Sequence, residues 1–117
     1  MTASFTFFLN RDGTVLMIYQ LTVPAAVPGV EEIRILEWHK EPGAEIAHGE
    51  MIVELETHKA VIEVRAGQPG VLRQILAQAG DWRTIGLPVA IFSSTADEAL
   101  PADGASASPM LVEFEVI

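Results

Sequence analysis

Residues 53–64, "VELETHKAVIEV", decide the fold, because they place two short strands on either side of a bend. The apolar residues Val53 and Leu55 alternate with glutamates before the bend, and "AVIEV" resumes the alternation after it. A period of two over such short runs predicts a β-hairpin whose tip holds His58 and Lys59. A bend this short leaves no room to bury Lys59, and we expect its side chain to project into solvent.

The rest of the chain repeats this pattern. Short runs rich in β-branched residues are separated by glycine and proline turns such as "EPGAEIAHG", "AGQPG" and "AGDWRTIG". No apolar spacing typical of a helix lasts for three turns, so the sequence predicts an all-β fold. The expected strands cover residues 18–23, 33–39, 51–56, 61–65, 71–77 and 88–92.

An internal repeat organises these strands. Gly43 and Gly49 lie six residues apart and lead into an apolar strand, and Gly80 and Gly86 do the same 37 residues later. Two such halves are each too short to bury an apolar face alone, so we expect them to pack together as a sandwich. Their junction lies near Lys59.

Two flanks lie outside the repeat, which we place in a core domain of residues 17–93. Residues 1–16 are interpreted as an N-terminal extension, which either adds a strand through a turn at "NRDG" or is dispensable for the core. Residues 94–109, rich in Ala, Ser, Asp and Pro, are typical of a flexible linker. Residues 110–117 again alternate like a strand, and the sequence leaves the partner of that strand open.

Composition excludes several functions. A net charge of -9 repels phosphate backbones and anionic lipid, so we expect neither nucleic acid nor membrane as a partner. The acidic residues concentrate between positions 31 and 64, which favours a basic protein surface as the partner. The absence of cysteine excludes disulfides and thiolate chemistry from the chain itself. Without a membrane-length apolar run or a basic leader, we expect one soluble, cytoplasmic domain.

The stretch "WHKEPGAEIAHGEMIVELETHKA" resembles the lipoyl domains of 2-oxo acid dehydrogenase complexes of the acyltransferase type. Those domains carry lipoic acid on a hairpin lysine in an E-T-D-K-A setting, which stands here as residues 56–60 with Lys59 as the attachment residue. Gly43, sixteen residues before Lys59, and Gly70, eleven after it, occupy places where the family favours glycine. The resemblance covers residues 17–93.

The resemblance implies a flattened β-barrel, or sandwich, of two four-stranded antiparallel sheets related by a pseudo-two-fold axis. It also implies a swinging lipoyl arm on Lys59 that shuttles acyl groups and reducing equivalents. The implied partners are a lipoate-attaching enzyme, a thiamine-dependent 2-oxo acid dehydrogenase, an acyltransferase core and dihydrolipoamide dehydrogenase. The domain alone is expected to catalyse nothing.

Other residues near Lys59 are assigned roles in recognition or turn geometry. Glu56, expected to be exposed, is the candidate for recognition by the attaching enzyme, with a purely solvated strand residue as the alternative. Thr57, His58 and Ala60 complete the motif, in which His58 replaces the usual aspartate. Gly43 and Gly70 are expected to serve backbone geometry. In the first half Ile33 stands at the counterpart of Gly70, and we expect a different loop before it.

Three alternatives remain open at this point. A biotin carrier shares the fold, but its lysine normally lies between two methionines, whereas Lys59 lies between His58 and Ala60. A glycine-cleavage carrier usually has extra helices for which residues 93–117 offer no pattern. The third alternative is an unmodified docking module. The spacing of His39, His48 and His58 matches no common metal site, so we expect no metal.

Overall fold

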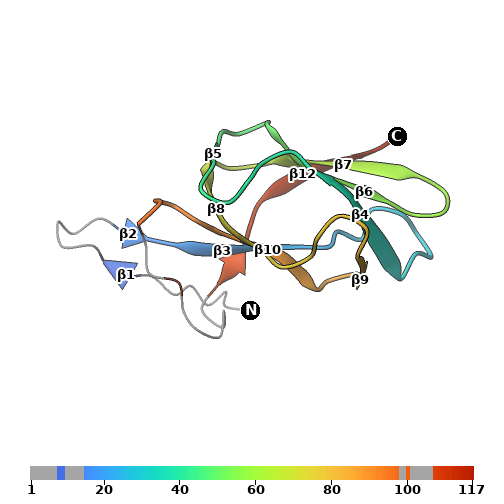
Figure 1. Ribbon diagram of the computed structural model, residues 1–117, viewed down its shortest axis with the longest axis horizontal. Coiled ribbons are helices and arrows are strands. Elements are labelled where there is room, and N and C mark those ends of the chain that lie inside the picture. Colours follow the sequence, from blue (N-terminus) through green and yellow to red (C-terminus); the bar gives the residue numbers. More distant parts are fainter. Residues whose placement is uncertain (1–7, 10–14, 98–99, 101–106) are drawn as a thin grey trace.

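The computed structural model describes residues 8–9, 15–97, 100 and 107–117. In this part of the chain every regular element is a β-strand, and no helix is long and apolar enough to cross a membrane. Two five-stranded sheets pack against each other, and a separate two-stranded hairpin precedes them (Figure 1). The predicted all-β fold is therefore confirmed.

Each sheet combines strands from both halves of the sequence. The first sheet has the order β11 (Ser108–Pro109), β3 (Ile18–Thr22), β10 (Pro88–Ser93), β8 (Gly70–Ile75) and β5 (Glu45–Ile46). The second has the order β12 (Val112–Val116), β7 (Val61–Ala66), β6 (Met51–Glu56), β4 (Glu32–Trp38) and β9 (Trp82–Thr84). All neighbours are antiparallel except β11 and β3, which are parallel.

The predicted pair of four-stranded antiparallel sheets is present in the inner part of this arrangement. The C-terminal segment adds a fifth strand to each sheet, as β11 and β12. Upstream, β1 (Phe8–Leu9) pairs with β2 (Val15–Leu16) in an antiparallel hairpin. The predicted turn at residues 10–13 and half of the predicted linker, residues 98–99 and 101–106, lie outside the described residues.

Three strands escaped the sequence analysis. β5 and β9 lie inside stretches that we predicted as turns, and β11 lies inside the predicted linker. A strand of two or three residues cannot show an alternation of apolar and polar residues, so only its pairing with β8, β4 or β3 reveals it. The six strands predicted in the core and the one predicted at residues 110–117 have bounds within two residues of the predicted ones.

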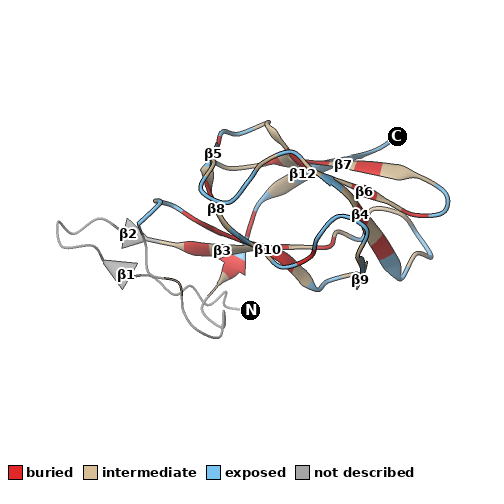
Figure 2. Cartoon of the chain, viewed as in Figure 1, coloured by how far each residue is buried: buried red, intermediate tan, exposed pale blue. Residues whose placement is uncertain are grey.

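The apolar core lies between the two sheets. Buried residues form bands along the strands in Figure 2, as expected when alternate side chains face the opposite sheet. Phe92 is the largest fully buried side chain. Around it lie, among others, Leu21, Ile33, Ile35, Ile52, Leu55, Ile62, Val64 and Leu72.

Hydrogen bonds reproduce the internal repeat in three dimensions. Gly43 N donates to Leu72 O at 2.7 Å, and 37 residues along, Gly80 N donates to Ile35 O at 2.8 Å. In both bonds a turn of one half is tied to a strand of the other half. The four glycines of the repeat share a left-handed backbone, with φ of 97°, 89°, 94° and 90° at Gly43, Gly49, Gly80 and Gly86. Glycine is favoured there because a Cβ disfavours this conformation.

The halves differ in one connection. The segment from β3 to β4 spans residues 23–31, whereas that from β7 to β8 spans only residues 67–69. Ile33 is buried in β4, while its counterpart Gly70 starts β8, where an added Cβ would stand 3.3 Å from the carbonyl oxygen of Ser93. The difference expected at Ile33 therefore appears in the loop before it, and the strands are preserved.

The C-terminal segment pairs with one edge of each sheet, at β3 and β7. Met110 is buried, and its N donates to Gln20 O at 3.0 Å, while Ile117 N donates to Val61 O at 2.8 Å. Gly67 lies against the segment, because an added Cβ would stand 3.0 Å from the Leu111 backbone. Covered edges offer no free ladder to another chain, so the segment protects β3 and β7.

Substitution of the repeat glycines tests the symmetry. We expect Gly43→Ala and Gly80→Ala each to lower the free energy of unfolding by about 1–2 kcal/mol, because both need positive φ. No atom lies within 4 Å of either added Cβ, so the cost is backbone strain. Chemical denaturation measures it. The control Gln78→Ala, in the same turn as Gly80, should change it by less than about 0.5 kcal/mol. Equal stability of all variants would contradict the conclusion that Gly43 and Gly80 are needed for their positive φ.

Gly67→Ala tests how tightly the C-terminal segment is attached. The added Cβ pushes against the Leu111 backbone, so we expect the amides of Val112–Val116 to exchange with deuterium faster. The amides of β6, on the far side of β7, serve as the internal control and should keep their protection. Unchanged exchange in β12 would show that the close contact at Gly67 is not what holds this strand.

Candidate functional site

The predicted hairpin forms at one end of the molecule. Strands β6 and β7 pair in antiparallel register up to Glu56 and Val61, and residues 57–60 make the tip. Figure 1 shows this hairpin projecting away from β1 and β2. Thr57 N donates to Ala60 O at 2.8 Å, and no residue other than glycine has a positive φ in the described chain. The tip is thus a short turn with ordinary backbone angles.

The side chain of Thr57 holds this turn together. Its Oγ1 accepts hydrogen bonds from Lys59 N and Ala60 N, both at 3.0 Å, and the residue is only 8% exposed. A threonine hydroxyl at the start of a turn is a known substitute for a backbone acceptor. Thr57 therefore fixes the backbone of the lysine itself, as the predicted role in turn geometry requires.

The two lysines of the chain have different surroundings. Lys59 is exposed, and among the described residues no carboxylate or carbonyl pairs with its ammonium group. Lys40 Nζ instead donates to Glu50 Oε2 at 2.6 Å. That bond, together with the hydrogen bond from Ala47 N, lowers the pKa of Glu50. Of the two amines, Lys59 is the one presented for reaction.

Glu56 is less exposed than the sequence analysis expected. It is half-buried on β6 and forms an ion pair with Arg34, its cross-strand neighbour on β4. This contact gives Glu56 a structural role in the sheet, besides the recognition role that stays a prediction. Arg34 in turn stands opposite Trp82 on β9, so the three side chains form one row across the outer face.

The other predicted site residues fall into two groups. His58 is exposed beside Lys59, and Ala60 closes the turn. Gly43 and Gly70 lie away from the tip, since Gly43 bonds to β8 and Gly70 lies against Ser93, at the far end of β10. Both glycines serve backbone geometry and packing, and they belong to the frame that carries the hairpin.

The three histidines do not converge on one site. His39 Nε2 lies 2.6 Å from Glu54 Oε1 and 4.0 Å from Glu37 Oε2, whereas His48 pairs with Glu113 at 3.4 Å. The His39 group escaped the sequence analysis, which compared histidines only with one another. Its signal is the i, i+2 spacing of Glu37 and His39, which places both on one face of the strand predicted over residues 33–39. The contacts of His39 Nε2 with Glu54 and Glu37 bring these three side chains together at the surface.

Known proteins resemble this chain over the residues that form its two-sheet core. A family model described as "Biotin-requiring enzyme", the biotin/lipoyl family, matches residues 19–92. The dihydrolipoyllysine-residue succinyltransferase component of the 2-oxoglutarate dehydrogenase complex of Bacillus subtilis is 34% identical over 79 residues, which are 68% of this chain and 19% of the relative. Pyruvate dehydrogenase E1 component subunit beta of Rhizobium meliloti is 31% identical over 88 residues, 74% of this chain and 19% of the relative.

A solved structure gives the same result. The lipoyl domain of the 2-oxoglutarate dehydrogenase complex from Azotobacter vinelandii superposes with a TM-score of 0.56 at 30% identity, covering 63% of this chain and 94% of that domain. The chain thus spans about a fifth of the curated relatives, but nearly all of a lipoyl domain. Biotin is not favoured, since the Bacillus relative and the structural neighbour are lipoyl proteins by name. The chain belongs to the biotin/lipoyl attachment family, as a lipoyl domain of the 2-oxo acid dehydrogenase acyltransferase type.

Proposed function

We propose that Lys59 carries a lipoyl group in amide linkage and that the domain is the swinging carrier of a 2-oxo acid dehydrogenase complex. The observation that carries this proposal is the exposed amine of Lys59, which has no ionic partner among the described residues, at the tip of a rigid hairpin in a lipoyl-domain fold. A carrier module of this kind is not catalytic by itself.

The hairpin suits the attaching enzyme. His58 and Lys59 are the exposed residues of the tip, so a narrow active site can take in the lysine without contact to the sheets. Thr57 holds the backbone at Lys59 before binding, and less conformational entropy is therefore lost when the enzyme binds. Amide formation then removes the charge of the lysine, which has no carboxylate partner to lose among the described residues.

The chemistry of a lipoyl carrier fits the composition of the chain. When bound, a lipoyl group supplies a cyclic disulfide that can take up an acyl group together with two electrons. The chain itself has no cysteine, so none of its own side chains exchanges with that disulfide. The protein contributes the position of the amine and a surface that partner enzymes recognise.

The proposed partners follow from the relatives. Their names place them in 2-oxoglutarate and pyruvate dehydrogenase systems. We therefore infer four partners: a lipoate-attaching enzyme, a thiamine-dependent 2-oxo acid dehydrogenase, an acyltransferase core and dihydrolipoamide dehydrogenase. The net charge of -9 favours partners that present basic surfaces around their active-site entrances.

Mass spectrometry tests the attachment. The chain expressed in a bacterium supplied with lipoate should gain the mass of one lipoyl amide, and peptide mapping should place it on the peptide that contains Lys59. Lys59→Arg should gain nothing. The matched control Lys40→Arg removes the other lysine and should be lipoylated like the unaltered chain. An unmodified Lys59, even with added lipoate ligase, would disprove the proposal, and retention by streptavidin would indicate biotin instead.

Thr57 tests the value of a rigid tip. In Thr57→Val the bonds to Lys59 N and Ala60 N are lost, so we expect the free energy of unfolding to fall by about 1 kcal/mol. Lipoylation in vitro should also slow, because the enzyme must then order the turn. Thr57→Ser keeps the hydroxyl and is the control. A valine variant modified as fast as the serine variant would show that turn rigidity does not matter for attachment.

A further inference from the structure

A hollow opens beside the lysine hairpin, with a volume of about 580 Å³. Three elements contribute its walls: the end of the β3–β4 connection, the start of β9 and the tip of the hairpin. The lining consists of Gly29, Val30, Glu31, Glu32, His58 and Trp82. Because His58 precedes Lys59 directly, any group attached to Lys59 is tethered at the rim of this lysine-end hollow.

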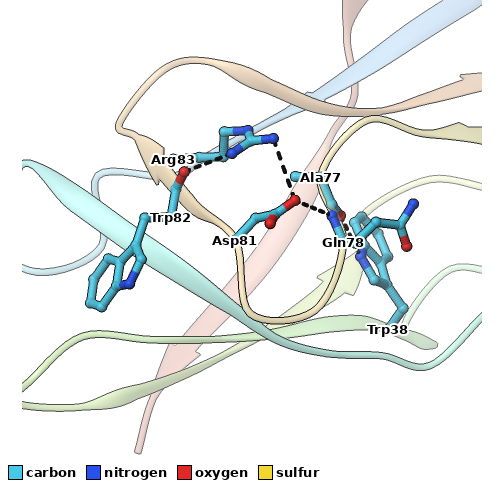
Figure 3. Close-up of polar contacts among 6 residues, drawn as sticks. All are labelled: Trp38, Ala77, Gln78, Asp81, Trp82 and Arg83. Carbon is cyan, nitrogen blue, oxygen red and sulfur yellow. Dashed lines mark hydrogen bonds and ion pairs between the residues drawn. The ribbon is translucent and has the colours of Figure 1, made fainter.

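Trp82 offers an aromatic face in this hollow. Its backbone is held firmly, since Arg83 Nη1 donates to Trp82 O at 2.8 Å and Ile35 N donates to the neighbouring Asp81 O at 2.9 Å. Trp82 as a whole, however, is 49% exposed. Figure 3 shows the ring pointing away from the contacts around Asp81, whereas Trp38 lies beside Ala77. The structure thus holds the backbone of Trp82 in place and leaves its side chain largely uncovered.

The wall of the hollow opposite Trp82 is also held by hydrogen bonds before any group binds. Ile85 N donates to Glu31 O at 2.9 Å, which ties the β3–β4 connection to the end of β9. Within that connection Val30 N donates to Val27 O at 3.3 Å, and Gly29 has a φ of 79°. Val30 packs against the core, so its side chain is a fixed apolar neighbour of the hollow.

The pseudo-two-fold symmetry supplies an internal comparison. A second hollow lies at the other end of the core. Its lining includes Glu45, Gln68 and Pro69, the counterparts at an offset of 37 residues of Trp82, Glu31 and Glu32. The position of the exposed tryptophan is therefore taken by a carboxylate in the mate hollow, which has no lysine hairpin beside it. Tyr19 lines the mate hollow and is half-buried, so what distinguishes the lysine end is the exposed indole of Trp82.

We propose that the lysine-end hollow is a resting site for the dithiolane ring of a lipoyl group on Lys59, with the ring against Trp82 and Val30. This inference rests on the proposed function and extends it to residues outside the motif. Sulfur atoms make favourable contacts with aromatic rings, and the ring is otherwise apolar. Tethering keeps the ring at a high effective concentration near the hollow, so even a weak contact is populated.

The charges at the rim define which occupant fits. Glu31 and Glu32 are both exposed there, and they disfavour a negatively charged group. A dithiolane joined through an amide is uncharged and meets no such repulsion. Free lipoate, which is an anion at neutral pH, should bind poorly to the unmodified chain, and this makes it a useful negative control.

Nuclear magnetic resonance of the lipoylated full chain tests the site directly. The chain has two tryptophans, and each gives a separate indole N–H signal. We expect the Trp82 signal and the Val30 amide to shift on lipoylation. Trp38, whose Nε1 donates to Ala77 O at 2.8 Å, is the internal control and should not move. An unchanged Trp82 signal in fully lipoylated protein would overturn the inference.

A second measurement uses the accessibility of the dithiolane disulfide to a reductant. We expect a water-soluble phosphine to reduce the disulfide about twofold faster, or more, in lipoylated Trp82→Glu than in the unaltered protein, because the contact with the indole is lost. Trp82→Phe should keep most of the protection. The matched control Glu45→Ala changes the mate hollow and should leave the rate unchanged. Equal rates in all four proteins would likewise overturn the resting site.

These measurements distinguish failure of the carrier function from failure of the resting site. Intact mass is recorded before either measurement, so the extent of lipoylation at Lys59 is known. Absence of the modification overturns the proposed function and this inference together. Complete modification with an unmoved Trp82 and equal reduction rates overturns only the resting site and leaves the carrier function in place.

Discussion

The fold depends on hydrogen bonds through which each half of the chain closes the other. Gly43 in the first half is bonded to Leu72 in the second, and Gly80 in the second half is bonded to Ile35 in the first. Each sheet likewise contains strands from both halves. Neither half can therefore bury its apolar face alone, and the two must form together. The position of every functional residue follows from this mutual closure.

One consequence is that the lysine lies at the junction of the halves. β6 ends the first half, β7 begins the second, and the turn between them belongs to neither sheet's core. The cross-strand register then positions the residues beside the hairpin. Glu56 on β6 stands opposite Arg34 on β4, and Arg34 stands opposite Trp82 on β9. The end of the molecule that presents Lys59 is built from residues that lie far apart in the sequence.

This distance along the sequence explains what could be predicted from the residues and what could not. The hairpin and the repeat glycines follow from local patterns, a period of two and a spacing of six, and these were recognised. The strands β5 and β9 are too short to have a pattern and exist only through their partners. The ion pair of Glu56 and the hollow at Trp82 depend on register between strands, which no local pattern records. Glu56 was thus expected to be more exposed than it is.

The departures from symmetry are most informative because the frame itself is symmetric. A duplicated fold supplies two equivalent ends, and packing alone gives no reason for them to differ on the surface. Yet the lysine end has a longer β3–β4 connection and an exposed Trp82, where the other end has a short connection and Glu45. Exposing an indole offers no gain in burial, so its stabilising value to the fold is small. The residues that break the symmetry therefore mark the end of the molecule at which function has shaped the surface.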